Sequence, residues 1–246
     1  KILEKGENKM IALVTGASSG IGRDIAIEFA KRKYDIIAVA RNEKALNDLK
    51  RDVEKEYNIN VDVSPMDLVD RDGCVQLHKE VKEKYGCIDV LVNDAGFGAC
   101  GDFTETDLDK ELGMIDTNIV ALHILTKLFL KDMVEENKGH IMNVASIAGF
   151  MPGPLMATYY STKAYVVRLT QSIRQELFMK HSKVKICALC PGPVNTNFNK
   201  VADVQFALKG LSSEYVAKYT TDKLFKGKFY IVPGWKIKLA KFGAKI

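Results

Sequence analysis

The fold of this 246-residue chain is set by residues 10–22, which read MIALVTGASSGIG. The apolar run 10–15 has the composition of a buried strand, and the glycine-rich segment 16–22 follows it directly. The segment 23–33 then mixes apolar and charged residues as an amphipathic helix does. Glycines let a backbone turn tightly and approach a pyrophosphate, and a helix N-terminus offers it unpaired N–H groups and partial positive charge. This strand, glycine turn and helix, with the spacing G-x-x-x-G-x-G, therefore predict a dinucleotide-binding turn.

Strand and helix patterns alternate along the rest of the chain. Short apolar runs predict further strands at residues 35–40, 59–64, 88–92, 140–144, 184–189 and 229–232. Helices are predicted at residues 70–85, at 104–137 as one or two helices, and at 158–180. Strands that alternate with helices form a parallel sheet that is covered on both faces. We therefore expect an α/β fold, a Rossmann-like doubly wound parallel sheet, in a single domain over residues 1–246.

Polar residues and glycines follow the ends of the predicted strands. Besides the glycine turn, they are Arg41, Asp67, Asn93, Ser146 and the pair Pro191-Gly192. Ligands of such sheets bind at the carboxyl ends of the strands, so these residues are expected to share one site.

Arg41 ends the second predicted strand, where a dinucleotide fold meets the adenosine ribose. An acid at this place accepts a hydrogen bond from the 2′-hydroxyl of NAD, whereas a basic residue favours the 2′-phosphate of NADP. The chain has Ala40 and Arg41 here and no acid before Glu43, which favours NADP(H). The alternative is that Arg41 is an ordinary exposed residue at the start of a helix.

Tyr159 and Lys163 lie four residues apart in the predicted helix 158–180, and Ser146 precedes the tyrosine by thirteen residues. Residues i and i+4 share one helix face, so the Lys163 ammonium can approach the Tyr159 phenol. A tyrosine has a pKa of about 10, and a cation within a few ångströms lowers that pKa by roughly 1–3. The pair is expected to transfer a proton near neutral pH, although tyrosine and lysine are frequent enough to meet by chance.

Together these motifs make the chain similar to the short-chain dehydrogenase/reductase family from residue 10 to about residue 232. The resemblance is carried by residues 15–22, Asp67, Asn93-Asp94-Ala95-Gly96, Asn118, Ser146, Tyr159-x-x-x-Lys163 and Pro191-Gly192-Pro193-Val194-x-Thr196. It implies that Tyr159 is the acid/base, that Lys163 also holds the nicotinamide ribose, and that Ser146 binds the substrate oxygen. Asn118 is implied to hold a water that links Lys163 to solvent.

The resemblance also implies a set of cofactor contacts. Asp67 is expected at the adenine, and Thr196 with the backbone of Val194 is expected at the carboxamide. Asn93 is also expected to tie adjacent strands together. The expected cofactor-binding residues are Gly16, Ser18, Ser19, Gly20, Ile21, Gly22, Arg41, Asp67, Leu68, Asn93, Ala95, Gly96, Tyr159, Lys163, Pro191, Gly192, Val194 and Thr196. Asp94 departs from the family, which usually has a second asparagine there, so its local hydrogen bonding is left open.

The implied reaction is hydride transfer between NADP(H) and a carbonyl or secondary alcohol. Ser146 and Tyr159 would stabilise the negative charge that develops on the carbonyl oxygen, and Tyr159 would deliver the proton. The expected pocket walls are mostly apolar and comprise Phe97, Met151, Leu155, Met156, Phe198 and Phe206, with a lid at residues 197–210. Such walls favour a lipophilic substrate, a steroid-like compound or a long-chain ketone.

Two alternatives to this function stay open. Within the same class, the chain could be a 3-ketoacyl-thioester reductase of fatty acid synthesis. From a different class, it could be a non-catalytic NADP(H)-binding regulator. Ketone-dependent oxidation of NADPH would separate an enzyme from a regulator.

Composition disfavours other classes of protein. Hydrophobic residues make up 47% of the chain, and the net charge of +5 is spread over solvated helix faces such as residues 50–56, so no nucleic-acid site is expected. No apolar run approaches the ~18 residues of a spanning helix. The five cysteines are an odd number, which favours reduced thiols and a cytoplasmic protein. Cys187 and Cys190 form an isolated C-x-x-C across a strand end, and no metal site is expected.

The two ends of the sequence carry weaker signals. Residues 1–5 show no secretory pattern, and the lack of an initiator Met is consistent with a short missing leader. Residues 233–246 interleave basic and apolar residues around Trp235, but with a period of two up to Leu239. That period does not support an amphipathic membrane helix, so this C-terminal tail is expected to pack on protein, at a subunit contact or beside the substrate pocket. The resemblance implies a homodimer or a homotetramer.

Overall fold

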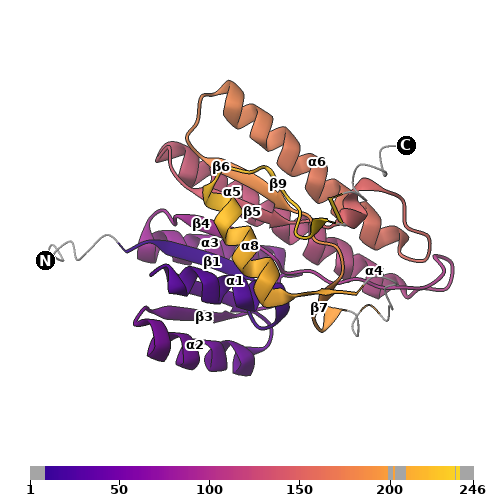
Figure 1. Cartoon of the computed structure of the whole chain (residues 1–246), viewed down its shortest axis with the longest axis horizontal. Coiled ribbons are helices and arrows are strands. Elements are labelled where there is room, and N and C mark those ends of the chain that lie inside the picture. The colour runs from indigo at the N-terminus through magenta and orange to yellow at the C-terminus, as the bar shows by residue number, and fades with distance from the viewer. Residues whose placement is uncertain (1–8, 199–201, 203–208, 236, 239–246) are drawn as a thin grey trace, which may run out of the picture.

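A single parallel sheet forms the centre of the molecule (Figure 1). The structure is a computed structural model that describes residues 9–198, 202, 209–235 and 237–238. In this part of the chain, seven strands hydrogen-bond in the order β3-β2-β1-β4-β5-β6-β9. They are β1 (Ile11–Thr15), β2 (Asp35–Ala40), β3 (Val61–Pro65), β4 (Val90–Asn93), β5 (His140–Val144), β6 (Lys185–Leu189) and β9 (Tyr230–Ile231). The strand order reverses between β1 and β4, which confirms the predicted Rossmann-like doubly wound sheet.

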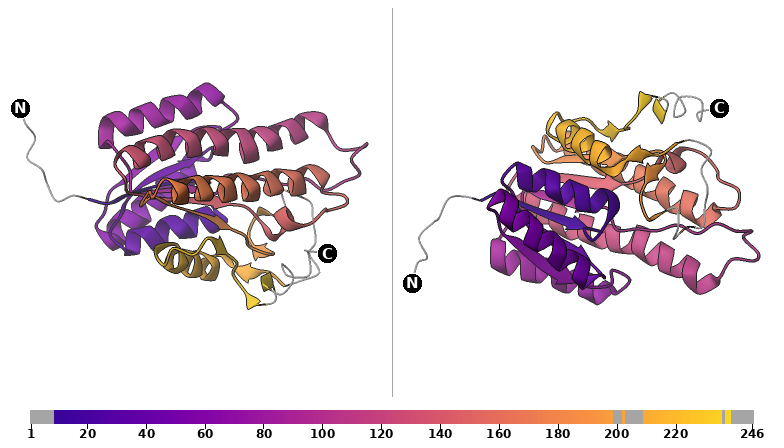
Figure 2. Two further views of the ribbon diagram at one scale, coloured as in Figure 1. Left: turned by 90° about the horizontal axis from the view of Figure 1, so that it is seen from above. Right: turned by 60° about the horizontal axis from the view of Figure 1, so that its bottom comes forward.

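Helices cover both faces of the sheet, as the two views in Figure 2 make visible. One face carries α1 (Gly20–Lys31), α2 (Glu43–Tyr57) and α8 (Ser213–Phe225). The other face carries α3 (Arg71–Tyr85), α5 (Leu122–Glu135) and α6 (Ala157–Met179). The remaining elements are α4 (Leu108–Ile115), the π-helix η1 (Asp116–Ala121), the 3-10 helix η2 (Ile147–Phe150), and a two-stranded parallel pair of β7 (Val194–Asn195) with β8 (Leu211–Ser212).

The strand β1 explains why the sequence builds two cores. All five of its residues are buried, and successive side chains point to opposite faces of the sheet. Ala12 and Val14 pack with the side of α1 and α2, whereas Ile11 and Leu13 pack with the side of α3 and α5. A continuous apolar run is therefore what a strand in the middle of a covered parallel sheet requires.

Helix α8 was not predicted from the sequence. It begins after Ser212, whose side chain accepts a hydrogen bond from the backbone N–H of Tyr215 at 3.2 Å. Its buried residues include Val216, Ala217 and Leu224, and these share a core with α1. The serine cap is a local signal that was available in the sequence.

The segment Leu108–Glu135 is long and apolar enough to cross a membrane, a property that inspection of the sequence missed. In the structure it comprises α4, η1 and α5, and its residues Leu125, Phe129 and Met133 are buried against the sheet. The segment is therefore a core element of the domain.

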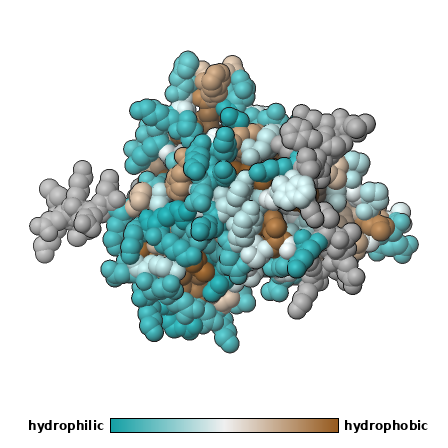
Figure 3. All heavy atoms as spheres, in the orientation of Figure 1, coloured by the Kyte–Doolittle hydropathy of each residue, from teal (hydrophilic) through white to brown (hydrophobic). Residues whose placement is uncertain are grey.

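The face of the molecule in Figure 3 is mostly hydrophilic, with small scattered apolar patches.

A buried hydrogen-bond network joins the middle of the sheet to the helices on one face. The Asn93 amide donates to Thr126 Oγ1 at 3.0 Å and to Asn143 Oδ1 at 2.9 Å. The Asn143 amide donates to Thr170 Oγ1 at 3.1 Å, and that hydroxyl donates to the Val166 carbonyl at 2.7 Å. This network ties β4 and β5 to α5 and α6, as expected for Asn93.

Thr170→Val should destabilise the protein by about 1–3 kcal/mol, because it leaves a buried amide hydrogen of Asn143 without an acceptor. Thr220→Val is a matched control, since Thr220 is equally buried and its hydroxyl has no hydrogen-bond partner among the described residues. The control should be neutral or slightly stabilising. Urea unfolding of both variants measures the difference, and equal losses would show that burial alone, not the network, sets the cost.

Candidate active site

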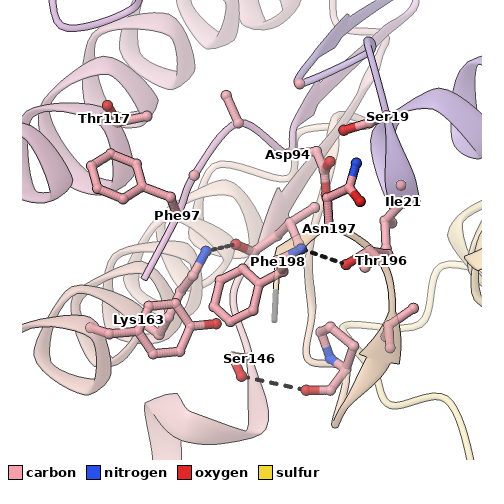
Figure 4. A pocket seen from close by; sticks show the side chains of 18 of the residues that line it. Ser19, Ile21, Asp94, Phe97, Thr117, Ser146, Lys163, Thr196, Asn197 and Phe198 are labelled. Atoms are coloured by element: carbon pink, nitrogen blue, oxygen red, sulfur yellow. Dashed lines mark hydrogen bonds between the residues drawn. The ribbon is translucent and has the colours of Figure 1, made fainter. Parts of the chain in front are cut away.

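A cavity of about 600 Å³ lies at the carboxyl ends of the strands. Figure 4 shows Ser19, Ile21 and Asp94 on one side of it and Ser146 and Lys163 on the other. The predicted site residues that line it are Gly16, Ser18, Ser19, Gly20, Ile21, Arg41, Asp67, Leu68, Ala95, Gly96, Ser146, Tyr159, Lys163, Pro191, Gly192, Val194 and Thr196. The fold therefore brings together residues that are spread over most of the sequence.

The glycine turn after β1 forms a cradle that side chains would fill. Gly16 has a φ of +72°, and a Cβ atom added there would lie 3.0 Å from the Ala95 backbone nitrogen. A Cβ atom added to Gly22 would lie 2.6 Å from the Gly16 carbonyl oxygen. With Ser18 to Ile21 lining the cavity, the N-terminus of α1 opens into it. This cradle fits the phosphates of a dinucleotide, which bind at helix N-termini by the same physical features.

Thr15 fastens the neighbouring loop to this turn, a role that sequence reasoning missed. Its hydroxyl accepts the backbone N–H of Asp94 at 3.0 Å and that of Ala95 at 3.1 Å. Thr15 is the last residue of β1 and is almost fully buried. The ends of β1 and β4 are thus held together where the strand order reverses.

Tyr159 and Ser146 meet in the wall of the cavity. A side-chain hydrogen bond joins Ser146 to the Tyr159 phenol, and the Ser146 hydroxyl also accepts the backbone N–H of Ala148 at 3.1 Å. Burial raises the pKa of Tyr159 to about 12, and the Ser146 hydrogen bond opposes that rise. Two hydroxyl groups at one point of a cavity can both donate to a substrate oxygen.

Lys163 is buried beside Tyr159 on α6, one turn further along. Its Nζ donates to the Val144 carbonyl at 2.8 Å and lies 5.8 Å from the centre of the Tyr159 ring. Burial lowers the pKa of Lys163 to about 8, and the charge of Asp94 opposes this. The shared helix face is confirmed, but the expectation that the lysine lowers the Tyr159 pKa is wrong for the protein alone. Loss of water around the buried phenol dominates there.

Asn118 lies in the π-helix η1, an irregularity that is frequent at functional sites. Its Oδ1 accepts the Phe97 N–H at 3.1 Å, and its Nδ2 donates to the Phe97 carbonyl at 2.9 Å and to Thr162 Oγ1 at 3.1 Å. The side chain therefore ties the loop after β4 to α6. Asn118 does not line the cavity, and its expected water relay stays a prediction.

Two of the expected cofactor contacts lie outside the lining of the cavity, so their contact with a cofactor stays a prediction. Asn93 is buried and uses its amide in the network with Thr126 and Asn143, so it does not line the cavity. Gly22 is buried below the turn and also does not line the cavity. Both residues pack behind the lining of the cavity. A sequence motif does not distinguish a residue that contacts a ligand from one that shapes the backbone.

Arg41 directly follows β2, and Asp67 follows β3 by two residues. The two side chains lie close together. Arg41 Nη1 lies 3.6 Å from Asp67 Oδ2, and the Arg41 side chain is 74% exposed. Both residues line the cavity, together with Asn42, whose side chain caps α2 by accepting the Ala45 N–H at 3.0 Å. The guanidinium is therefore accessible to an anion at this end of the cavity.

The other end of the cavity is apolar. The expected walls Phe97, Met156 and Phe198 line it, and so does Tyr160. The Phe198 ring lies 5.3 Å from the Tyr159 ring. Met151 and Leu155 do not line the described cavity, and Leu155 is largely exposed, so their role as walls stays a prediction. Phe206 and most of the expected lid lie outside the described residues.

Gly98 makes room for this apolar end. A Cβ atom added to it would lie 2.8 Å from Phe198 Cζ and 3.3 Å from Tyr159 Cδ2. The missing side chain therefore lets the Phe198 ring seat against the tyrosine. From the sequence alone, no signal marked this glycine.

The described part of the C-terminal tail reaches the edge of the cavity. Ile237 is buried, and a Cβ atom added to Gly192 would lie 2.4 Å from its Cδ1. Trp235 is largely exposed. The role of the tail as a subunit contact stays a prediction.

The cysteines and other metal-ligating groups form no separate centre in the described structure. Cys187 and Cys190 belong to different hydrophobic clusters, as expected for residues on opposite faces of a strand end. Residues 9–198, 202, 209–235 and 237–238 contain no group of three or more His, Cys, Asp or Glu that could hold a metal ion.

Comparisons with known proteins identify the family of the chain. The model of the short chain dehydrogenase family matches residues 10–205. The chain is 32% identical over 191 residues to an NADP-dependent 3-hydroxy acid dehydrogenase of Schizosaccharomyces pombe, which covers 77% of this chain and 73% of that protein.

Two solved structures share the fold over nearly the whole chain. A short-chain dehydrogenase from Sphingobium yanoikuyae in complex with NADPH has a TM-score of 0.87 and 26% identity, covering 96% of this chain and 93% of that one. The bulky-bulky ketone specific alcohol dehydrogenase from Comamonas testosteroni has a TM-score of 0.83 and 25% identity, covering 97% and 94%. With the family match over most of its length, the chain belongs to the short-chain dehydrogenase/reductase family of NAD(P)-dependent oxidoreductases that act on CH–OH groups.

Proposed function

We propose that this protein is an NADP(H)-dependent reductase of a lipophilic ketone, or the dehydrogenase of the corresponding secondary alcohol. The observation that carries the proposal is one cavity that Tyr159, Ser146 and Lys163 line together with an open glycine turn. Figure 4 shows Ser146 and Lys163 opposite Ser19 and Ile21. A bound nicotinamide would give or accept the hydride. The protein's own residues would bind the substrate oxygen and move the proton.

In this mechanism Ser146 and Tyr159 hold the carbonyl oxygen of the substrate. Both hydroxyls donate to it, which stabilises the negative charge that develops as the carbonyl carbon is reduced. Tyr159 then gives its proton to that oxygen, and the reverse transfer serves alcohol oxidation. Lys163 lies on the same helix face, 5.8 Å from the centre of the Tyr159 ring, and in its protonated form it would place positive charge beside the tyrosine. Asn118 and Thr162 fix the loop and the helix that carry these groups.

The preference for NADP(H) rests on Arg41. The guanidinium is exposed at the cavity end of β2, and Asp67 is the one acidic group paired with it among the described residues. A planar guanidinium binds a phosphate through two parallel hydrogen bonds. The NADP-dependent relative from Schizosaccharomyces pombe and the NADPH complex from Sphingobium yanoikuyae are consistent with this preference.

The preference for a lipophilic substrate rests on the apolar end of the cavity. Phe97, Met156 and Phe198 leave few polar groups there besides the Tyr159, Tyr160 and Ser146 hydroxyls. A solved relative from Comamonas testosteroni is specific for bulky-bulky ketones. An apolar wall of this kind binds a hydrocarbon skeleton while the hydroxyls orient the reacting group.

Phe198→Ala should raise KM for a bulky lipophilic ketone by about three- to tenfold, because it removes apolar contact area next to Tyr159. The KM for a small ketone should change much less. Phe103→Ala is the matched control, since Phe103 is exposed and does not line the cavity. Equal KM changes for bulky and small ketones would argue against a hydrophobic substrate wall.

A panel of ketones and secondary alcohols, assayed with NADP(H) and NAD(H), tests the proposal directly. Ketone-dependent NADPH oxidation should be detected, with kcat/KM rising as the apolar groups of the ketone grow. A 3-ketoacyl thioester belongs in the panel, because a reductase of fatty acid synthesis is the alternative within this class. Binding of NADPH without turnover of any compound would favour a non-catalytic regulator.

The cellular compartment and the oligomeric state of the enzyme are also part of the proposal. None of the five cysteines forms a disulfide in the described structure, which supports a reducing, cytoplasmic compartment. We expect a homodimer or homotetramer, and light scattering of the purified protein measures which. No partner other than the substrate and the cofactor is required by the mechanism.

A further inference from the structure

Asp94 places a carboxylate against the glycine turn. A Cβ atom added to Gly22 would lie 2.6 Å from Asp94 Oδ2, and one added to Gly16 would lie 3.1 Å from the same oxygen. The carboxylate is therefore in contact with the turn that fits the cofactor phosphates. Asp94 also lines the cavity itself.

The position of this carboxylate is fixed by the fold. The Thr15 hydroxyl accepts the Asp94 backbone N–H at 3.0 Å, and a backbone hydrogen bond joins Gly22 to the carboxylate. Gly22 is the third residue of α1, so its N–H has no partner within the helix. The first turn of α1 contains no acidic residue, and the Ser19 side chain makes no capping hydrogen bond. Asp94, the residue after β4, thus supplies the negative charge that favours a helix N-terminus.

The surroundings of Asp94 act on its pKa in opposite directions. Burial raises the pKa of Asp94 to about 7, while the Lys163 charge and the Gly22 hydrogen bond oppose the rise. From α6, Lys163 and Tyr159 are the titratable groups that interact with it. β1 faces it with the Thr15 hydroxyl.

The charged residues nearest in sequence to the turn belong to a separate group. Arg23 and Asp24 follow Gly22 in α1 and lie 3.7 Å apart, and Asp24 also interacts with Lys31, Ser213 and Glu214. Arg41 and Asp67 pair with each other at the far end of the cavity. Asp94 is therefore the carboxylate that stands directly against the turn.

We propose that Asp94 makes cofactor binding proton-linked, so that its carboxylate takes up a proton when the dinucleotide phosphates bind at the glycine turn. The inference rests on the proposed function, because it needs phosphates at that turn. Phosphate charge next to a carboxylate disfavours the ionised form and favours the protonated one. A protonated Asp94 no longer repels the phosphates.

The sign of the effect follows from linkage. The pKa of Asp94 is about 7 without cofactor and is higher with cofactor bound. Affinity is therefore greatest below pH 7 and falls as the pH rises, until the pH exceeds the pKa of the bound state. Each unit by which binding raises that pKa corresponds to about a tenfold change in affinity.

Fluorescence titration with NADH between pH 5.5 and 9 tests the proposal on the wild-type protein and on Asp94→Asn. NADH is the probe because it lacks the 2′-phosphate, which itself titrates near pH 6. Asparagine keeps the size of the side chain and can still accept the Gly22 N–H. We expect wild-type affinity to fall about tenfold from pH 6 to pH 9, whereas Asp94→Asn binds as wild type at pH 6 and about tenfold tighter at pH 9.

Calorimetry of NADPH binding at pH 7.5, in two buffers with different ionisation enthalpies, counts the protons taken up. Uptake should be present in the wild type and absent in Asp94→Asn. In Lys163→Met, which keeps the carboxylate, uptake should persist but move to higher pH, because the Lys163 charge no longer lowers the pKa of Asp94. Loss of uptake in Lys163→Met with retention in Asp94→Asn would assign the proton to the lysine and overturn the proposal. The same pH slope in wild type and Asp94→Asn would also overturn it. Failure of the wild type to bind either dinucleotide at any pH would instead contradict the proposed function.

Discussion

Tyr159→Phe should lower kcat for ketone reduction by about 10²–10⁴-fold, the usual contribution of a positioned general acid. The substitution removes the hydroxyl that hydrogen-bonds Ser146 and leaves the ring packed beside Phe198 and Tyr160. Because the ring stays in place, NADPH affinity should remain within a few-fold of wild type. Steady-state kinetics and fluorescence titration of NADPH measure the two quantities on one preparation.

Two other tyrosines of α6 serve as controls for this result. Tyr165 does not line the cavity, and its hydroxyl lies 2.7 Å from His123 Nδ1, so Tyr165→Phe should keep full kcat. Tyr160 lines the cavity next to Tyr159, so Tyr160→Phe is expected to change KM more than kcat. An active Tyr159→Phe together with an inactive Tyr160→Phe would show that the acid/base has been assigned to the wrong tyrosine.

Arg41→Ala should weaken NADPH binding by about ten- to hundredfold and leave NADH binding almost unchanged. The estimate corresponds to the roughly 1.5–3 kcal/mol of a hydrogen bond to a charged group. The side chain is 74% exposed and paired only loosely with Asp67, at 3.6 Å, so its removal should cost little stability. The wild-type preference for NADPH over NADH should also fall as ionic strength rises.

Arg51→Ala is the matched control for the arginine substitution. Arg51 is similarly exposed on α2, pairs with Asp48 and Asp52, and does not line the cavity. It should leave the affinity for both dinucleotides unchanged. If Arg41→Ala weakens NADH as much as NADPH, Arg41 acts on the backbone of the site rather than on the 2′-phosphate.

Most of the fold could be predicted because its signals are local. A buried strand such as β1 reads as a continuous apolar run, and the glycine turn with α1 follows it without interruption. Helix α8 was not predicted, although Ser212 caps it. It follows the expected lid at residues 197–210, and that segment shows no strand or helix pattern that would lead into a helix. The boundary between α4 and α5 could not be placed either, since the π-helix η1 joins the two helices without a break.

The candidate site was predicted in its composition but not in all its roles. Asn93, Asn118 and Gly22 belong to the motifs, yet each one acts on protein groups behind the cavity wall. Their partners, such as Thr162 and the Phe97 backbone, come from distant parts of the chain. A motif defines which residues recur together, whereas contacts between elements decide which of them face a ligand.

The sequence by itself determined the class of sheet, the glycine cradle and the shared helix face of Tyr159 and Lys163, because each depends on residues that are neighbours along the chain. Only the tertiary structure decided the charges in the site. Burial raises the pKa of Tyr159 to about 12 and that of Asp94 to about 7, and it lowers the pKa of Lys163 to about 8. These values depend on how much water the packed elements remove around each group, and the order of residues along a chain does not specify that quantity.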